Sequence, residues 1–260
     1  MNSARQLQRD QPLIFVTPTY PRRSRLGFLE RCARDFSAVR DLFWLVVEDD
    51  AATAPDVERL LAQSGVRHLY LAHGPTRKWG NAQRDHGLRH IRDQCWRGVV
   101  YLADDDNKYA PPLFDELRKV ERLGVLPVGR RGPWGIERPI VRDGRLIRWN
   151  ADWKRRKYPV DMAGFAFRAE LLPDISGEIF RYRGGGGESE LIDLLIKSPV
   201  ELEFLCNDCR DCHVWHNLPL GWSARRGLAA YIAHRRTPGF IRRPAYRLID
   251  SLGLRGEGAY

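Results

Sequence analysis

The stretch that decides the fold is Gly98-Val-Val-Tyr-Leu-Ala-Asp-Asp-Asp-Asn107. A continuous apolar run follows the glycine and stops at three successive aspartates, as in a strand that is buried on both faces. Two earlier segments follow the same pattern: Leu13-Ile-Phe-Val16 runs into Thr-Pro-Thr-Tyr20, and Phe43-Trp-Leu-Val-Val47 runs into Glu-Asp-Asp50. Because ligands gather at the carboxyl ends of parallel strands, we expect these polar ends to form one site.

Helical patterns separate these strands. Apolar residues at helical spacing predict three helices, over 26–39, 54–64 and 81–96, with a further short strand at 68–71. Strands alternating with helices predict an α/β fold with a mostly parallel sheet covered on both faces. The second half differs, with a candidate hairpin at 142–145 and a helix at 188–197 after a glycine run. We therefore expect a nucleotide-binding α/β half joined to a smaller α+β half.

The charge of the chain is unevenly distributed. Its 260 residues carry a net charge of +10, and residues 221–260 contribute eight Arg against one Asp and one Glu. A basic surplus favours an anionic partner such as a nucleic acid, a lipid surface or a phosphate-bearing substrate. No apolar run reaches the roughly 18 residues of a membrane span. Neither GxGxxG after the first strand nor GxxxxGK[ST] occurs, which disfavours a dinucleotide dehydrogenase and a P-loop NTPase.

The cysteines are consistent with a reducing compartment. There are five, an odd number, and no secretory signal is recognisable. Cys206, Cys209, Cys212 and His213 are spaced like metal ligands, but a structural zinc site usually has a second pair of ligands farther along the chain. We therefore expect a disulfide within the cluster or reduced thiols rather than a metal.

The polar strand ends suit a nucleotide sugar. Three adjacent aspartates repel one another unless a cation compensates, and carboxylate oxygens suit Mg²⁺ or Mn²⁺ that also binds substrate phosphates. The aromatic ring of Tyr20 can stack on a base, and an acid after the second strand can hydrogen-bond it. The residues thus predict a pocket for a metal-bound nucleotide sugar.

At this level of detail the sequence resembles glycosyltransferase family 43, the β-1,3-glucuronosyltransferases that build proteoglycan linkers and related glycans. Eight blocks keep the order and spacing of the family: 12–20, 43–49, 98–107, 126–129, 135–139, 158–166, 187–189 and 214–216. The resemblance implies a GT-A fold, a UDP-sugar donor, a Mn²⁺ cofactor with Mg²⁺ as the alternative, and inversion at the anomeric carbon. Glucuronic acid is the donor sugar that it favours.

The resemblance also assigns roles to residues. Tyr20 matches the aromatic residue that stacks on uridine, and Asp49 matches the acid that binds uracil. Asp106 of the DxD-type motif matches the direct metal ligand, and Glu188 matches the catalytic base. The acceptor side is represented by Glu137 and Asp161. The positions that match donor-binding residues are Pro18, Thr19, Tyr20, Asp49, Arg84, Asp104, Asp105, Arg156 and His216.

The sequence departs from the family pattern in places. Asp85 stands where the family has Asn, and Leu218 stands where it has Arg, so a diphosphate contact is lost or is supplied by Arg225 or Arg226. The segments around Trp134 and Trp149 do not follow the animal members, which leaves UDP-xylose or another UDP-sugar open. A nucleotidyltransferase, a sugar-binding pseudoenzyme and a protein that binds nucleic acid through the basic tail are the rival readings.

The expected organisation has three parts. Residues 12–108 form the part that binds UDP-sugar and metal, residues 109–222 supply acceptor binding and the base, and residues 223–260 form a basic tail. The tail either binds an anionic membrane surface or packs on the catalytic body. We expect the chain to lack the family's membrane anchor and stem, and therefore to be a soluble, bacterial-type enzyme of polysaccharide biosynthesis, cytoplasmic or peripheral at the inner membrane face. We expect a glycan or glycolipid acceptor, no nucleic acid, and a homodimer as in other family members.

Overall fold

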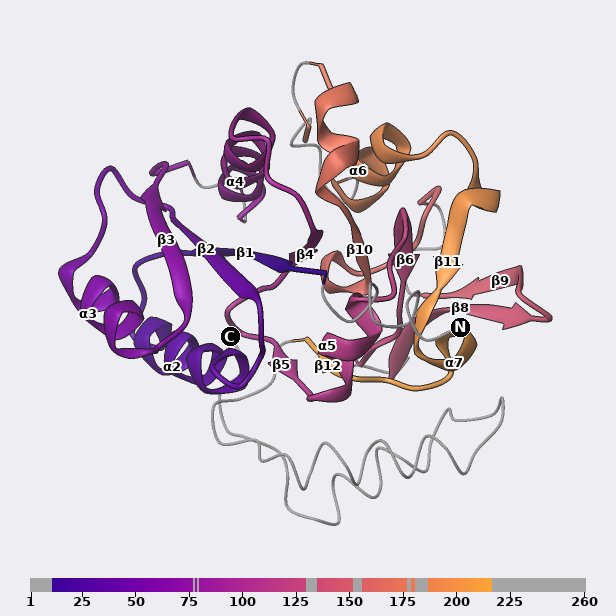
Figure 1. The fold of residues 1–260 in the computed structure, drawn as a ribbon, viewed down its shortest axis with the longest axis horizontal. Coiled ribbons are helices and arrows are strands. Elements are labelled where there is room, and N and C mark those ends of the chain that lie inside the picture. The colour runs from indigo at the N-terminus through magenta and orange to yellow at the C-terminus, as the bar shows by residue number, and fades with distance from the viewer. Residues whose placement is uncertain are drawn as a thin grey trace, which may run out of the picture.

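The computed structural model describes residues 11–76, 78, 80–129, 135–151, 156–176, 179–180 and 187–216. Its centre is a seven-stranded sheet in the order β11-β6-β10-β4-β1-β2-β3 (Figure 1). The strands are β1 (Leu13–Thr19), β2 (Leu42–Glu48), β3 (Arg67–Ala72), β4 (Val99–Leu102), β6 (Leu123–Val125), β10 (Phe165–Arg168) and β11 (Leu202–Phe204). Four neighbouring pairs are parallel, and β10 runs antiparallel to both β4 and β6. The expected mostly parallel sheet is confirmed.

Helices cover both faces of this sheet. The longer ones are α2 (Arg25–Phe36), α3 (Pro55–Gln63), α4 (Asn81–Asp93), α5 (Pro112–Leu117) and α6 (Gly187–Leu195). The first three and the last of these match the predicted helices to within a turn. α2, α3 and α5 share one apolar layer, and α4 and α6 share the other. None of the helices in the described ranges is long and apolar enough to cross a membrane.

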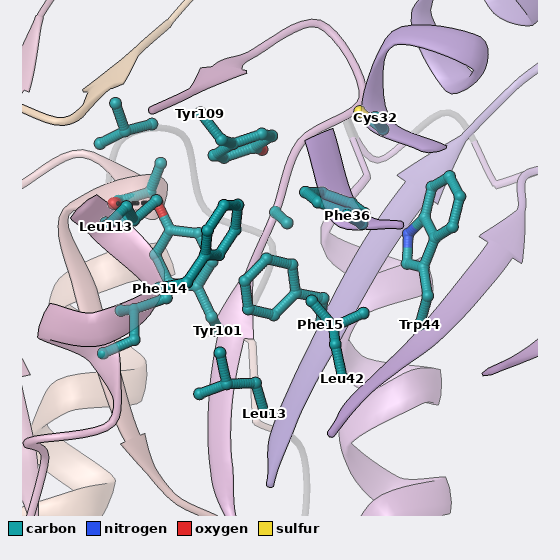
Figure 2. Close-up of a cluster of buried hydrophobic side chains, with 14 of the residues drawn as sticks. Leu13, Phe15, Cys32, Phe36, Leu42, Trp44, Tyr101, Tyr109, Leu113 and Phe114 are labelled. Atoms are coloured by element: carbon teal, nitrogen blue, oxygen red, sulfur yellow. Dashed lines mark hydrogen bonds between the residues drawn. The ribbon is translucent and has the colours of Figure 1, made fainter. Parts of the chain in front are cut away.

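The layer beneath α2 is built from aromatic rings (Figure 2). Because side chains alternate along a strand, Phe15 points into this layer while Val16 points into the opposite one. The ring of Phe36 meets the rings of Phe15 and Trp44 edge to face, with centroids 5.0 and 5.1 Å apart. This packing fixes α2 against β1 and β2, and so fixes the strand ends relative to the helix.

A second, five-stranded sheet carries the other half of the chain, in the order β5-β12-β7-β8-β9. Its strands are β5 (Lys108–Tyr109), β7 (Val128–Gly129), β8 (Ile136–Arg142), β9 (Arg145–Asn150) and β12 (Val214–Trp215). The predicted hairpin is confirmed, and Asp143 and Gly144 form its turn with φ of +51° and +68°. The large sheet continues past residue 108, because β6, β10 and β11 all come from the later part of the chain.

The cysteine cluster lies on α7 (Leu205–Cys209) and the segment after it. Cys206, Cys209 and Cys212 are buried free thiols, and burial raises the pKa of Cys212 to about 12. The backbone from 206 to 209 has positive φ throughout, a left-handed turn. Of the two outcomes expected here, the structure has the reduced thiols.

A buried hydrogen bond in the aromatic layer offers a first test of the fold. Trp44 Nε1 donates to Thr17 Oγ1 at 2.8 Å across β1 and β2. We expect Trp44→Phe to lower the free energy of unfolding by about 2 kcal/mol, because it removes the donor and leaves a small cavity. Thr17→Val should lower the free energy of unfolding less in the Trp44→Phe background than in the parent protein. Urea denaturation of the parent, the two single variants and the double variant measures these free energies. Strict additivity of the two substitutions would contradict the bond.

Candidate active site

The loop after β4, residues 104–107, is held in place by helix α2. Arg31 Nη2 donates to the carbonyl oxygen of Asp106 at 2.7 Å, and the Cys32 thiol donates to that of Asp105 at 3.4 Å. Because α2 is itself fixed by the aromatic layer, these bonds transmit the rigidity of the core to the loop. The three aspartates are therefore presented in a fixed arrangement.

The three carboxylates of this loop differ in their partners. Asp104 is ion-paired with Arg84, and Asp105 is ion-paired with Arg22 at 2.6 Å. The carboxylate of Asp106 makes no hydrogen bond or ion pair with any residue in the described part of the chain. Burial raises the pKa of Asp106, and the neighbouring carboxylate of Asp104 raises it further. An oxygen ligand without a partner in this position is what a divalent cation would complete.

Arg22 is a site residue that the sequence analysis missed. Its guanidinium lies 4.2 Å from the ring centroid of Tyr20, which is 52% exposed, while it also bonds Asp105. Thr19 Oγ1 donates to the other oxygen of Asp105 at 2.9 Å. Burial raises the pKa of Asp105 to about 6, and Arg22 and Thr19 oppose that rise. In the sequence, Arg22 follows the aromatic residue Tyr20 by two positions, after a strand whose neighbour ends in acids. This position could have marked Arg22 as a candidate site residue.

Asp49 lies at the end of β2 with one of its oxygens in use. Oδ1 accepts hydrogen bonds from the backbone N–H of Thr76 at 2.6 Å and from its hydroxyl at 3.0 Å. A Cβ on Gly74 would lie 2.4 Å from the same oxygen, so the close approach requires glycine. Asp49 is partly exposed and can reach a ligand. Pro18, by contrast, is buried within β1, and its predicted contact with the donor stays a prediction.

A second cluster of charged side chains gathers around Arg156. Its guanidinium bonds Glu137 at 3.0 Å and Glu188 at 3.2 Å, and it donates to the carbonyl of Val160 at 2.8 Å. The side chain of Arg156 is only 10% exposed, so it lies inside the cluster and does not belong to a solvated basic face. Glu188, on the first turn of α6, is 19% exposed and so remains partly accessible.

His216 connects the two clusters electrostatically. Its Nδ1 lies 3.4 Å from Oδ1 of Asp161, which also accepts the backbone N–H of Ala163 at 3.0 Å. Burial lowers the pKa of His216, but the carboxylates of Asp161, Asp104 and Asp106 outweigh it and raise the value to about 9. His216 therefore carries a positive charge at neutral pH, beside the aspartate loop.

The base candidate and the aspartate loop are also linked by direct packing. A Cβ on Gly187 would lie 3.2 Å from Nδ2 of Asn81, at the start of α4. Asn81 Oδ1 accepts from Arg84 at 3.0 Å, and Arg84 bonds Asp104. The N-terminal turn of α6, which carries Glu188, is thus three contacts from Asp104 of the aspartate loop. The structure brings together the residues that the sequence places far apart.

The described residues contain no preformed metal cage. No three His, Cys, Asp or Glu side chains within the described ranges converge on a common point, and this includes the cysteine cluster. Asp106 is the carboxylate of this loop that could hold a divalent ion, since Mg²⁺ is often bound through one or two protein carboxylates. Several predicted features lie outside the described residues: Trp134, the glycines at 184–186, Leu218, Arg225, Arg226 and the rest of the tail.

Comparison with known proteins identifies the family. A model of glycosyltransferase family 43 matches residues 32–218. The chain belongs to glycosyltransferase family 43. This family member is 36% identical over 222 residues to galactosylgalactosylxylosylprotein 3-beta-glucuronosyltransferase 2 of Homo sapiens, covering 79% of this chain and 68% of the relative. It is 34% identical over 216 residues to the corresponding enzyme P of Drosophila melanogaster, covering 79% and 45%. The chain thus spans less than half of one relative and about two thirds of the other.

Solved structures agree on the fold. TarS of S. aureus, residues 1–349 in complex with UDP, has a TM-score of 0.55 to this family 43 chain at 11% identity, covering 80% of this chain and 60% of that one. The same TarS fragment in a second structure has a TM-score of 0.53 at 13% identity, covering 79% and 60%. At these identities the likeness concerns the fold, and it confirms the GT-A fold that the sequence predicts.

Proposed function

We propose that this family 43 chain is a metal-dependent, inverting glycosyltransferase that moves glucuronic acid from UDP-glucuronic acid to a hydroxyl of a glycan or glycolipid. The observation that carries the proposal is the chain of contacts from Asp104 through Arg84 and Asn81 to Gly187. It supports a single site, because Asp104 lies two residues before Asp106 and Gly187 directly precedes Glu188. Family membership and the names of the relatives support the reaction class and the donor. Those names also favour an acceptor that ends in galactose.

The donor would lie along the strand ends. Its uracil would stack on the exposed ring of Tyr20, on the face that Arg22 leaves open, and would hydrogen-bond the free oxygen of Asp49. Arg84 and Asp104 would meet the ribose and the sugar. The charged imidazole of His216 would face the diphosphate, where it stabilises the negative charge that develops on the leaving UDP.

Asp106 is the residue that would hold the metal, and Mn²⁺ is the ion we propose, with Mg²⁺ as the alternative. Its partly buried carboxylate has no ion-pair partner among the described residues and fits a hard cation, whereas the carboxylates of Asp104 and Asp105 are paired with arginines. When bound, the ion supplies charge neutralisation at the diphosphate.

Glu188 would act as the general base. An inverting transfer needs one carboxylate to take the proton of the acceptor hydroxyl as it attacks from the face opposite UDP. Arg156 holds one oxygen of Glu188 at 3.2 Å and leaves the other available. Glu137 binds the same guanidinium and so fixes Arg156, while Asp161 would complete the acceptor side together with Glu137.

A nucleotide screen tests the proposed donor. Thermal denaturation of the full chain, with and without Mn²⁺, is measured against UDP-glucuronic acid, UDP-xylose, UDP, CTP and ATP. We expect UDP and UDP-glucuronic acid to raise the melting temperature in the presence of Mn²⁺ and CTP and ATP to have no such effect. A larger rise in melting temperature with UDP-xylose would identify xylose as the donor sugar in place of glucuronic acid and would leave the proposed reaction class unchanged. A response to CTP or ATP in place of UDP would point to nucleotidyl transfer and overturn the proposal.

Arg22 should be needed for donor affinity. We expect Arg22→Ala to weaken UDP binding about tenfold, because it removes the cation beside Tyr20 and leaves Asp105 without its ion-pair partner. Isothermal titration calorimetry measures the dissociation constant. Arg25→Ala is the matched control, since Arg25 is also ion-paired, in its case with Glu48 and Asp56. This variant should change stability more than UDP affinity. Equal UDP affinity in Arg22→Ala and the parent protein would remove Arg22 from the donor site.

A further inference from the structure

The hairpin of β8 and β9 presents one face made largely of arginine. The ladder pairs Ile140 with Arg148 and Arg142 with Arg145, and Arg138 lies two residues before Ile140 on β8. Residues directly opposite each other, and residues two apart along a strand, share a face. Arg138, Arg142, Arg145 and Arg148 therefore form one surface, which we call the arginine face. Glu137, of the acceptor cluster, alternates to the opposite face of β8.

The arginine face lacks compensating acids within the described residues. Arg142, Arg145 and Arg148 are exposed, and none of them forms an ion pair or side-chain hydrogen bond with a described residue. Arg138 is half-buried and donates to the carbonyl of Cys209 at 2.7 Å. Burial lowers the pKa of Arg138, and the guanidiniums of Arg148 and Arg210 lower it further. The positive charges thus repel one another, and the nearest carboxylate in the hairpin sequence on this side is that of Asp143, in the turn.

The like charges of the arginine face destabilise the hairpin, and protection of an edge strand does not require them. β9 is the last strand of its sheet, and exposed charges do protect such edges from pairing with other chains. Mixed charges would serve that purpose equally well. Arg142 directly opposite Arg145 is instead a like-charge pair, which is unfavourable in a two-stranded ladder.

An exposed aliphatic side chain interrupts the arginines. The ladder shifts register between Ile140 and Val141, which makes Ile147 the extra residue of a bulge on β9. Ile147 is 57% exposed, although its neighbours Leu146 and Trp149 are partly buried. The hairpin projects from the end of the molecule opposite α3, with its turn outermost (Figure 1). Phosphate-binding pockets are concave and polar, whereas this hairpin projects and carries an exposed apolar residue. The hairpin therefore does not resemble a phosphate-binding pocket.

We propose that the arginine face and Ile147 dock this protein on a bilayer surface that is rich in anionic lipids. The guanidiniums would bind lipid phosphates and carboxylates, and Ile147 would enter the boundary between headgroups and acyl chains. A soluble polyanion would satisfy the arginines but would leave Ile147 in water, so the bilayer is the better fit. Because Glu137 is on the same strand but on its opposite face, docking through the arginine face leaves the Glu137 side of the hairpin uncovered. This inference does not depend on which sugar is transferred.

Vesicle co-sedimentation of the full chain tests the inference. The vesicles are pure phosphatidylcholine or a 3:1 mixture of phosphatidylcholine and phosphatidylglycerol, at low ionic strength. We expect Arg142→Gln/Arg145→Gln/Arg148→Gln to lower the partition coefficient on the anionic vesicles at least tenfold, since each arginine near such a surface contributes roughly fivefold. Ile147→Ser should lower it by roughly threefold. Neither variant should differ from the parent on phosphatidylcholine alone.

Two controls separate docking from net charge and from misfolding. Arg34→Gln/Arg59→Gln/Arg67→Gln removes the same charge from exposed positions on α2, α3 and β3, and should keep binding within about threefold of the parent. Arg145→Glu places an opposite charge across from Arg142, so it should bind the anionic vesicles more weakly while melting at the same or a higher temperature. Equal sedimentation of the parent and the hairpin triple variant, or equal losses in the two triple variants, would overturn the inference. So would a parent protein that does not sediment with the anionic vesicles.

Discussion

Glu188→Gln is expected to lower the rate of sugar transfer by about a thousandfold while leaving the affinity for UDP unchanged. Glutamine keeps the size of the side chain and an oxygen that can accept from Arg156, at the 3.2 Å contact seen for Glu188. What it loses is the ability to take a proton, and general bases contribute roughly 10²- to 10⁴-fold. Steady-state kinetics with UDP-glucuronic acid measures kcat, and isothermal titration calorimetry measures UDP binding.

The neighbouring acid on the same helix provides the control. Glu190→Gln makes the same chemical change two residues along the first turn of α6, and should keep kcat within about threefold of the parent. If Glu188→Gln turned over sugar at the parental rate, Glu188 would not be the base. If it lost UDP affinity to the same degree as kcat, Glu188 would act in donor binding and not in proton transfer.

Asp106→Ala is expected to abolish the dependence of UDP binding on Mn²⁺. In the parent protein, we expect chelation of the metal with EDTA to weaken UDP binding about a hundredfold, because the diphosphate then faces an uncompensated carboxylate. The variant should bind UDP weakly whether Mn²⁺ or EDTA is present. Calorimetric titrations of UDP under the two conditions give the four dissociation constants.

The control for charge is an acid at the end of β2, two strands away from β4 in the same sheet. Asp50 follows β2, is partly exposed, and accepts a hydrogen bond from the N–H of Ala51 at 2.7 Å. Asp50→Ala should retain the response to EDTA. A full response to EDTA in Asp106→Ala would assign the metal to another residue, and no response in the parent would make the proposed ion wrong.

The parallel core of the fold could be predicted from the sequence, because each of its strands is locally encoded. Apolar runs at 13–16 and 43–47 end abruptly in polar residues, and helical spacing between them excludes a hairpin. The antiparallel insertion of β10 between β4 and β6 could not be predicted, since the sequence of its four residues does not indicate whether the strand pairs in a parallel or an antiparallel manner. Pairing of β6, β10 and β11 into the large sheet is likewise a long-range result of packing.

The site shows the same limit. Its carboxylates were visible because they cluster in sequence, as in Asp104 to Asp106. The differences between these carboxylates could not be predicted, because they depend on ion-pair partners that the fold supplies. Arg84 lies 20 residues before Asp104, and Arg22 lies 83 residues before Asp105. Arg156 stands in a run of four basic residues, 154–157, and only the fold shows that it lies between Glu137 and Glu188.

The most direct test is the reaction itself, followed by nuclear magnetic resonance. The full chain is incubated with UDP-glucuronic acid, Mn²⁺ and a galactose-terminated disaccharide, and the release of UDP and the configuration of the new linkage are recorded together. We expect UDP formation that requires the acceptor and a product whose glucuronosyl linkage is β, inverted from the α-linked donor. An α-linked product, or no acceptor-dependent release of UDP from any UDP-sugar with any galactoside, would contradict an inverting UDP-sugar transferase.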